Sequence, residues 1–140
     1  MNIEKLSIKL AKNLEYYVND PNKRCVNRSG ECTYSGKMLG LKTKGCFVGS
    51  LMPAKTRLSI DKNIGLGGVD TVIQKSDVFG IKIPKFIKDH SNVMTSFQSL
   101  HDNSFYWEDG GLSKLGVSIL KVIINKHSLN EDPFKKFLTD

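Results

Sequence analysis

The chain has 140 residues, of which 39% are hydrophobic and 25% are charged, and its formal net charge is +7. This composition is typical of a globular domain and excludes a disordered chain or a low-complexity fibre. No apolar run reaches the roughly 18 residues of a membrane span, and charged residues interrupt the apolar pattern of residues 1–14. We therefore expect neither membrane association nor a signal peptide. Three cysteines are too few for a disulfide scaffold, which favours the cytoplasm.

The first predicted element is an amphipathic helix over residues 2–18. Apolar residues recur there at spacings of three and four, which is the period of one helical face: Ile3, Leu6, Leu10, Leu14 and Tyr17. Pro21 ends this helix, because proline cannot continue a helix and disfavours helical backbone just before itself.

A segment rich in Gly, Ser, Asn and Lys follows at residues 22–45. The β-prone residues from Cys32 to Tyr34 precede a turn there, so we expect a short β-hairpin near residues 31–48 within an otherwise irregular loop. The apolar segment 46–52 predicts one or two helical turns, which Pro53 stops.

The second half carries two stronger helical patterns. Residues 58–83 consist of short apolar pieces between glycines and predict no clear element, whereas Pro84 opens a short helix. Ser91 is an N-cap for a helix that reaches about residue 106. After a break at Gly110-Gly111, a further helix extends to about Lys126. Its predicted core face consists of Leu112, Leu115, Ile119, Val122 and Ile123.

These elements predict a mainly α fold with about four to five helices. No internal repeat and no long linker divides the chain, so we expect one domain over residues 1–140, with a basic, loop-rich segment at 21–57.

All of the excess positive charge lies in this basic segment. Residues 21–57 contain eight basic residues and one acidic residue, whereas the remainder contains 13 of each. The basic residues are Lys23, Arg24, Arg28, Lys37, Lys42, Lys44, Lys55 and Arg57. Such a segment attracts phosphate backbones or acidic protein surfaces. The alternative is a solvated loop whose lysines serve solubility alone.

Three short motifs resemble a group of small phage and bacterial proteins. They are Glu31-Cys32-Thr33-Tyr34, the segment Gly45–Pro53, and Leu100-His101-Asp102. Members of the group read roughly Cys-x-Tyr, then Cys-x-x-Gly-x-Leu-x-Pro, then a helix with Leu-x-x-His-Asp. The resemblance covers residues 24 to about 125 and implies a mobile-element origin without an assigned activity. This chain departs from the pattern by a longer stretch rich in Gly and Lys between the first two motifs.

Cys46, His101 and Asp102 supply the residue types of a cysteine nucleophile, a base and an acid. Adjacent residues on a helix point about 100° apart, however, so we expect that His101 and Asp102 do not contact each other. The alternative is a buried cysteine and a hydrogen-bonded core histidine. A zinc site would draw on Cys25, Cys32, Cys46 and His101. Their spacings lack a Cys-x-x-Cys pair, so we expect no metal and no cofactor.

Two hypotheses follow from the sequence. In the first, the chain is an accessory protein of a phage or similar element, which binds and modulates a host protein or nucleic acid in the host cytoplasm through the basic segment. In the second, it is a small cysteine-dependent hydrolase or transferase that uses Cys46 and His101. The sequence favours the first hypothesis, because the catalytic residues that the second one requires are poorly arranged.

Overall fold

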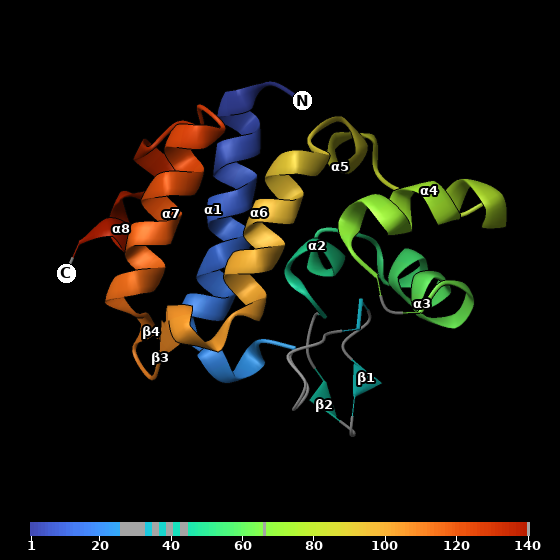
Figure 1. Ribbon diagram of the computed structural model, residues 1–140, viewed down its shortest axis with the longest axis horizontal. Helices are drawn as coiled ribbons and strands as arrows, with labels where there is room; N and C mark the ends of the chain where they lie inside the picture. The colour runs from blue at the N-terminus through green and yellow to red at the C-terminus, as the bar shows by residue number, and fades with distance from the viewer. Residues whose placement is uncertain (26–32, 35–36, 39–40, 43–44, 66, 140) are drawn as a thin grey trace. The chain divides into compact units, whose positions relative to one another are not determined.

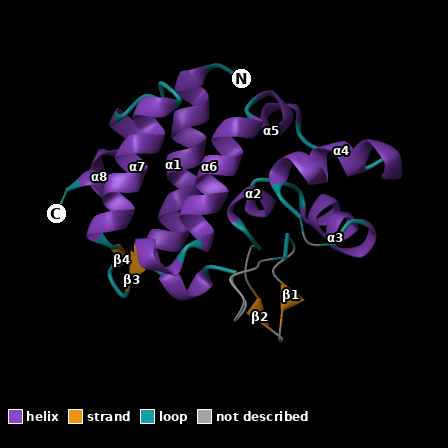
Figure 2. Ribbon diagram, viewed as in Figure 1, coloured by secondary structure: helices purple, strands orange, loops and turns teal. Residues whose placement is uncertain are grey.

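The computed structural model describes residues 1–25, 33–34, 37–38, 41–42, 45–65 and 67–139 (Figure 1). Among these residues are eight α-helices, three short 3-10 helices and two two-stranded antiparallel ladders (Figure 2). The predicted α class is therefore confirmed, but the expected number of four to five helices is too low. No helix of the described residues is both long and apolar enough to cross a membrane.

The chain divides into two compact units. Unit 1 comprises residues 1–23 and 103–140, and unit 2 comprises residues 24–102. The prediction of one domain is not tested by this division and stays a prediction.

Unit 1 joins the two ends of the chain. In chain order its elements are α1 (Ile3–Asn19), η1 (Pro21–Lys23), η2 (Ser104–Tyr106), β3 (Trp107–Glu108), β4 (Gly111–Leu112), α7 (Lys114–Lys126), η3 (Asp132–Phe134) and α8 (Lys135–Leu138). The predicted apolar face of α1 is confirmed for its three leucines and Tyr17, which are buried, but not for Ile3, which is 40% exposed. The amide of Asn130 donates to the Ser7 hydroxyl at 2.9 Å, which ties the C-terminal segment to α1.

The buried face of α7 differs from the predicted one. Leu115 and Val122 are 51% and 58% exposed, whereas Leu120 is buried. Gly116 explains the difference, because a Cβ atom there would lie 2.1 Å from the Tyr106 carbonyl oxygen. The helix therefore approaches η2 along its glycine face, and a count of apolar residues does not detect a glycine contact. The predicted core positions of Leu115 and Val122 are therefore wrong, whereas that of Ile123 is confirmed.

Unit 2 holds the remaining elements. In chain order they are β1 (Lys37–Met38), β2 (Leu41–Lys42), α2 (Phe47–Ser50), α3 (Ala54–Asn63), α4 (Val69–Phe79), α5 (Lys85–Asp89) and α6 (Ser91–Asp102). The β1–β2 ladder pairs Lys37 with Lys42 and Met38 with Leu41, within the range predicted for a hairpin. The helical turns predicted before Pro53 and after Pro84 are present as α2 and α5.

Helices α3 and α4 occupy the region for which the sequence predicts no clear element. Ile60 is the buried residue of α3, and one buried side chain creates no apolar stripe. The buried face of α4 includes Ser76, whose hydroxyl donates to the Val72 carbonyl at 2.6 Å. A satisfied serine interrupts the apolar period without interrupting the helix.

Tyr34 anchors α3 and the start of α4. Its backbone amide donates to an Asp61 carboxylate oxygen on α3 at 2.9 Å. Its phenol donates to the Gly67 carbonyl before α4 at 3.2 Å. In the same unit, the rings of Phe47 on α2 and Phe97 on α6 stack with centroids 5.1 Å apart. The two hydrogen bonds of Tyr34 tie down the two helices that border the site described next.

Candidate functional site

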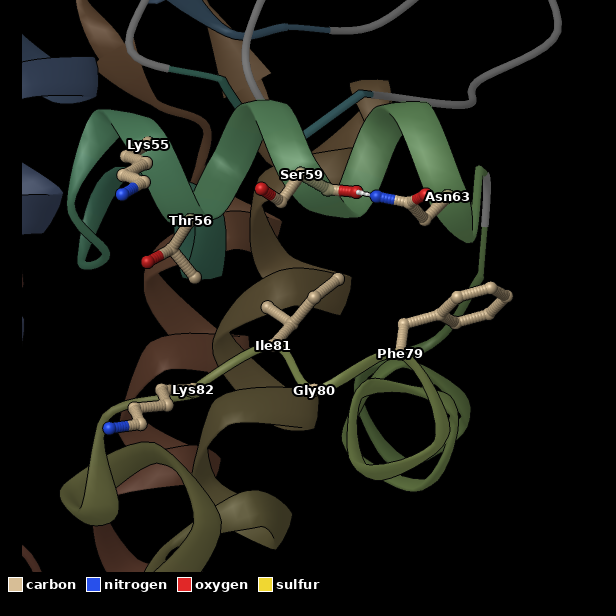
Figure 3. A pocket seen from close by; sticks show the side chains of 8 residues that line it. All are labelled: Lys55, Thr56, Ser59, Asn63, Phe79, Gly80, Ile81 and Lys82. Carbon is tan, nitrogen blue, oxygen red and sulfur yellow. Dashed lines mark hydrogen bonds between the residues drawn. The ribbon is translucent and has the colours of Figure 1, made fainter.

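A groove of about 400 Å³ lies beside α3 in unit 2 (Figure 3). One wall is α3, which contributes Lys55, Thr56, Ser59 and Asn63, and the other is the segment 79–82 at the end of α4. The two walls run in opposite directions, so the start of α3 faces Lys82 and its end faces Phe79 (Figure 3). We call this feature the α3 groove.

Gly80 shapes the second wall of the α3 groove. It adopts the left-handed conformation, with φ of 67°, and ends α4. The Ile81 amide then donates to the Ser76 carbonyl at 2.9 Å, as in the usual glycine-terminated helix end. The chain leaves α4 with Ile81 turned toward α3, while Lys82 follows on the same wall (Figure 3).

The α3 groove has a cationic end and an aromatic end. Lys55 and Lys82 lie at one end and are exposed, and Thr56 adds a hydroxyl there (Figure 3). Phe79, which is 51% exposed, lies at the other end beside Asn63. The described lining residues include two lysines and no carboxylate. This lining attracts anions, and the exposed ring offers a flat apolar surface.

Sequence reasoning identified Lys55 but missed Lys82 and Phe79. Phe79 is the last residue of α4 and Lys82 follows this helix, which the apolar pattern did not reveal. A signal was nevertheless present, because Phe79-Gly80 after an apolar segment is typical of a helix end.

The other residues of the basic segment are spread over the molecule. Lys23 belongs to unit 1, where its ammonium lies 4.9 Å from the centroid of the Tyr16 ring. Arg57 on α3 is half-buried. Lys37 and Lys42 form one of the two residue pairs of the β1–β2 ladder. The predicted residues Arg28 and Lys44 lie outside the described residues.

Arg24 has a structural contact that the sequence did not predict. Its guanidinium Nη1 donates to the carbonyl of His101 at 2.7 Å, at the end of α6. A cation at this position compensates the partial negative charge of a helix C-terminus. Burial lowers the pKa of Arg24, although nearby Asp102 raises it. Arg24 therefore holds the end of α6, and its part in partner binding stays a prediction.

His101 and Asp102 contact each other, which corrects the expectation that they do not. His101 Nδ1 and a carboxylate oxygen of Asp102 are 2.7 Å apart at the end of α6, where the helix ends. Gln98 Nε2 donates to the same oxygen at 2.8 Å, and its own Oε1 accepts from the Val48 amide at 3.0 Å. Burial lowers the pKa of His101 and outweighs the opposing effect of Asp102. This polar cluster joins α6 to the start of α2.

The imidazole of His101 is completely buried, which makes it a core group. Its carboxylate contact is the one a catalytic base uses for orientation, but a general base must also reach the proton that it removes from a substrate. The described geometry therefore supports a neutral histidine that fixes the end of α6.

Cys46 serves as the N-cap of α2. Its Sγ accepts from the Gly49 amide at 3.3 Å, and the residue is 1% exposed. The Sγ of Cys25 lies 3.6 Å from the Thr33 carbonyl oxygen. Reactivity of Cys46 stays a prediction.

Of the four residues considered for zinc, Cys32 lies outside the described residues. Within the described part of the chain, no three His, Cys, Asp or Glu side chains converge as metal ligands.

Comparison of the chain with protein families, curated proteins and solved structures finds no match. The resemblance to small phage and bacterial proteins therefore remains an expectation from the sequence motifs.

Proposed function

We propose that this chain is a non-enzymatic binding protein whose unit 2 takes up an anionic macromolecule at its basic surface. The observation that carries the proposal is the α3 groove, in which Lys55 of the basic segment and Lys82 lie at one end without a carboxylate among the described lining residues. The phage resemblance extends the proposal to a macromolecule of a bacterial host. A cysteine-dependent activity is not proposed, because Cys46 and His101 are both buried.

The distribution of charge between the two units supports this proposal. Unit 2 contains twelve basic and six acidic residues, which leaves +6 of the total +7. A concentrated positive field raises the encounter rate with polyanions and releases their bound counterions on contact. Both effects weaken as salt is added, because screening reduces the field.

Retention on an immobilised polyanion such as heparin tests the proposal. We expect the double variant Lys55→Glu/Lys82→Glu to elute at clearly lower salt than the wild type. The matched control is Lys114→Glu/Lys121→Glu, which makes the same change of net charge on exposed positions of α7 in unit 1. We expect this control to elute close to the wild type, and both variants to keep the thermal transition of the wild type.

Two results would contradict the proposal. A wild-type protein that passes through the column at low salt does not bind polyanions. Equal losses in the two double variants would show that net charge, rather than the α3 groove, determines retention.

A further inference from the structure

We infer that the α3 groove binds single-stranded nucleic acid, with phosphates at its cationic end and a base on the ring of Phe79. This inference rests on the proposed function and names its class of ligand. It is carried by the juxtaposition of two lysines and an exposed aromatic ring along one groove (Figure 3).

The cationic end suits phosphate oxygens. Lys55 and Lys82 lie on opposite walls and both side chains extend toward the same end of the groove, so a strand that passes this end brings a phosphate to each ammonium. The Thr56 hydroxyl at the same end supplies a neutral donor of the kind that commonly contacts nucleic-acid backbones. The cationic end therefore accommodates phosphate oxygens, and the choice of nucleic acid over an acidic protein rests on the aromatic end.

The aromatic end suits a base. The Phe79 ring is half exposed, and it lies at the end of the groove away from the lysines. Every base presents a π-face, so stacking on such a ring needs no particular sequence. Asn63 stands beside it with its amide fixed, because its Nδ2 donates to the Ser59 carbonyl at 2.9 Å. In a duplex the faces of the bases are already stacked, which makes a single strand the better occupant.

The length of the groove fits a short stretch of strand. Lys55 and Asn63 are eight residues apart on α3, or about 12 Å at 1.5 Å per residue. Stacked nucleotides advance by about 3.4 Å each, so this length corresponds to roughly three or four of them. A phosphate at the lysines and a base at Phe79 therefore belong to the same short segment.

Fluorescence anisotropy of a labelled oligothymidylate, titrated at several salt concentrations, tests the inference. The slope of log K against log salt is negative, and the loss of two phosphate contacts makes it shallower by about 1.4, at about 0.7 per contact for single strands. We expect this shallower slope for Lys55→Ala/Lys82→Ala and an unchanged slope for the control Lys114→Ala/Lys121→Ala. Phe79→Leu keeps the apolar bulk but removes the ring, so we expect affinity to fall about tenfold, near the lower end of the effect of losing one stacked base, with an unchanged slope. Its control is Phe105→Leu, an exposed phenylalanine of unit 1.

Duplex DNA of the same sequence and polyglutamate serve as comparison ligands. We expect both to bind more weakly than the oligothymidylate, with no effect of Phe79→Leu. Tighter binding of polyglutamate would overturn the inference and leave the proposed function standing, with an acidic protein as partner. Equal binding of single strand and duplex, unaffected by Phe79→Leu, would also overturn it, because contact would then involve the backbone alone. If none of the three polyanions binds, the proposed function fails as well.

Discussion

At the residue scale, the buried His101 has an electrostatic environment that bears on stability. His101 is held between the Asp102 carboxylate at Nδ1 and the main-chain contact that Arg24 makes with its carbonyl. Arg24 also acts against protonation of the ring, so burial and a neighbouring cation both oppose the effect of Asp102. The folded protein thus favours the neutral imidazole, which fits its place in the core.

This environment predicts a dependence of stability on pH. The pKa of His101 in the folded protein lies below the ordinary value of 6.5, chiefly because burial penalises the charged ring. Below about pH 6.5 the unfolded chain therefore binds more protons than the folded protein does. The free energy of unfolding then falls as the pH falls toward the folded pKa, by at most about 1.4 kcal/mol per pH unit for one group.

The His101→Gln variant should lose much of this pH dependence between about pH 5 and 7.5, the range in which histidine titrates. The measurement is the urea midpoint at several pH values, which reports the slope separately from the absolute stability. His127 is a useful control, because burial also lowers its pKa but the residue is only partly buried. His127→Gln should change the slope less. Equal slopes in the wild type and His101→Gln would contradict the prediction.

At the scale of single elements, apolar periodicity predicted helices whose buried face consists of large side chains. The helix α1 has such a face, and its predicted bounds agree with the structure to one residue at each end. The helices α3 and α4 bury too few apolar residues for the pattern to appear, and α4 has Ser76 at one of its buried positions. The α3 groove depends on both helices, so the sequence identified Lys55 without the surface on which it acts. Contacts that involve glycine or paired polar groups, such as His101 with Asp102, also have no apolar signal.

The helix α7 shows this limit most clearly. Several faces of this helix are almost equally apolar, because its second half contains Ile119, Leu120, Val122, Ile123 and Ile124. The choice between them comes from Gly116, where only a glycine permits the close approach to the Tyr106 carbonyl. Ser113 supports this arrangement, since its hydroxyl caps the helix by accepting from the Gly116 amide at 3.1 Å.

Two aspartate substitutions on α7 distinguish the two faces. Leu120→Asp places a carboxylate at a completely buried position, and we expect a loss of several kcal/mol in the free energy of unfolding. Leu115→Asp places the same group at a half-exposed position near the start of the helix, where we expect a change of about 1 kcal/mol or less. Chemical denaturation measures both. A larger loss for Leu115→Asp would restore the face predicted from the sequence.

At the scale of the whole molecule, charge is divided unevenly. Unit 2 has a net charge of +6, whereas unit 1 has nine basic and eight acidic residues and is nearly neutral. Concentrated like charge attracts polyanions but also opposes the compact state through self-repulsion. The positive charge of unit 2 should therefore lower its stability at low salt, and added salt should restore part of that stability by screening the repulsion.

Exposed lysines in the middle of one helix of each unit provide a test of this repulsion. We expect Lys75→Glu on α4 to raise the melting temperature at low salt, because it lowers the charge of unit 2 from +6 to +4. The gain should be a few tenths of a kcal/mol, as for other surface substitutions, and it should shrink as salt screens the field. Lys121→Glu on α7 takes unit 1 from +1 to −1, so its net charge keeps the same magnitude and little change is expected. Melting curves of both variants over a series of salt concentrations provide the measurement. If the two variants respond alike at every concentration, the repulsion is not confined to unit 2, and the concentration of charge there does not govern stability.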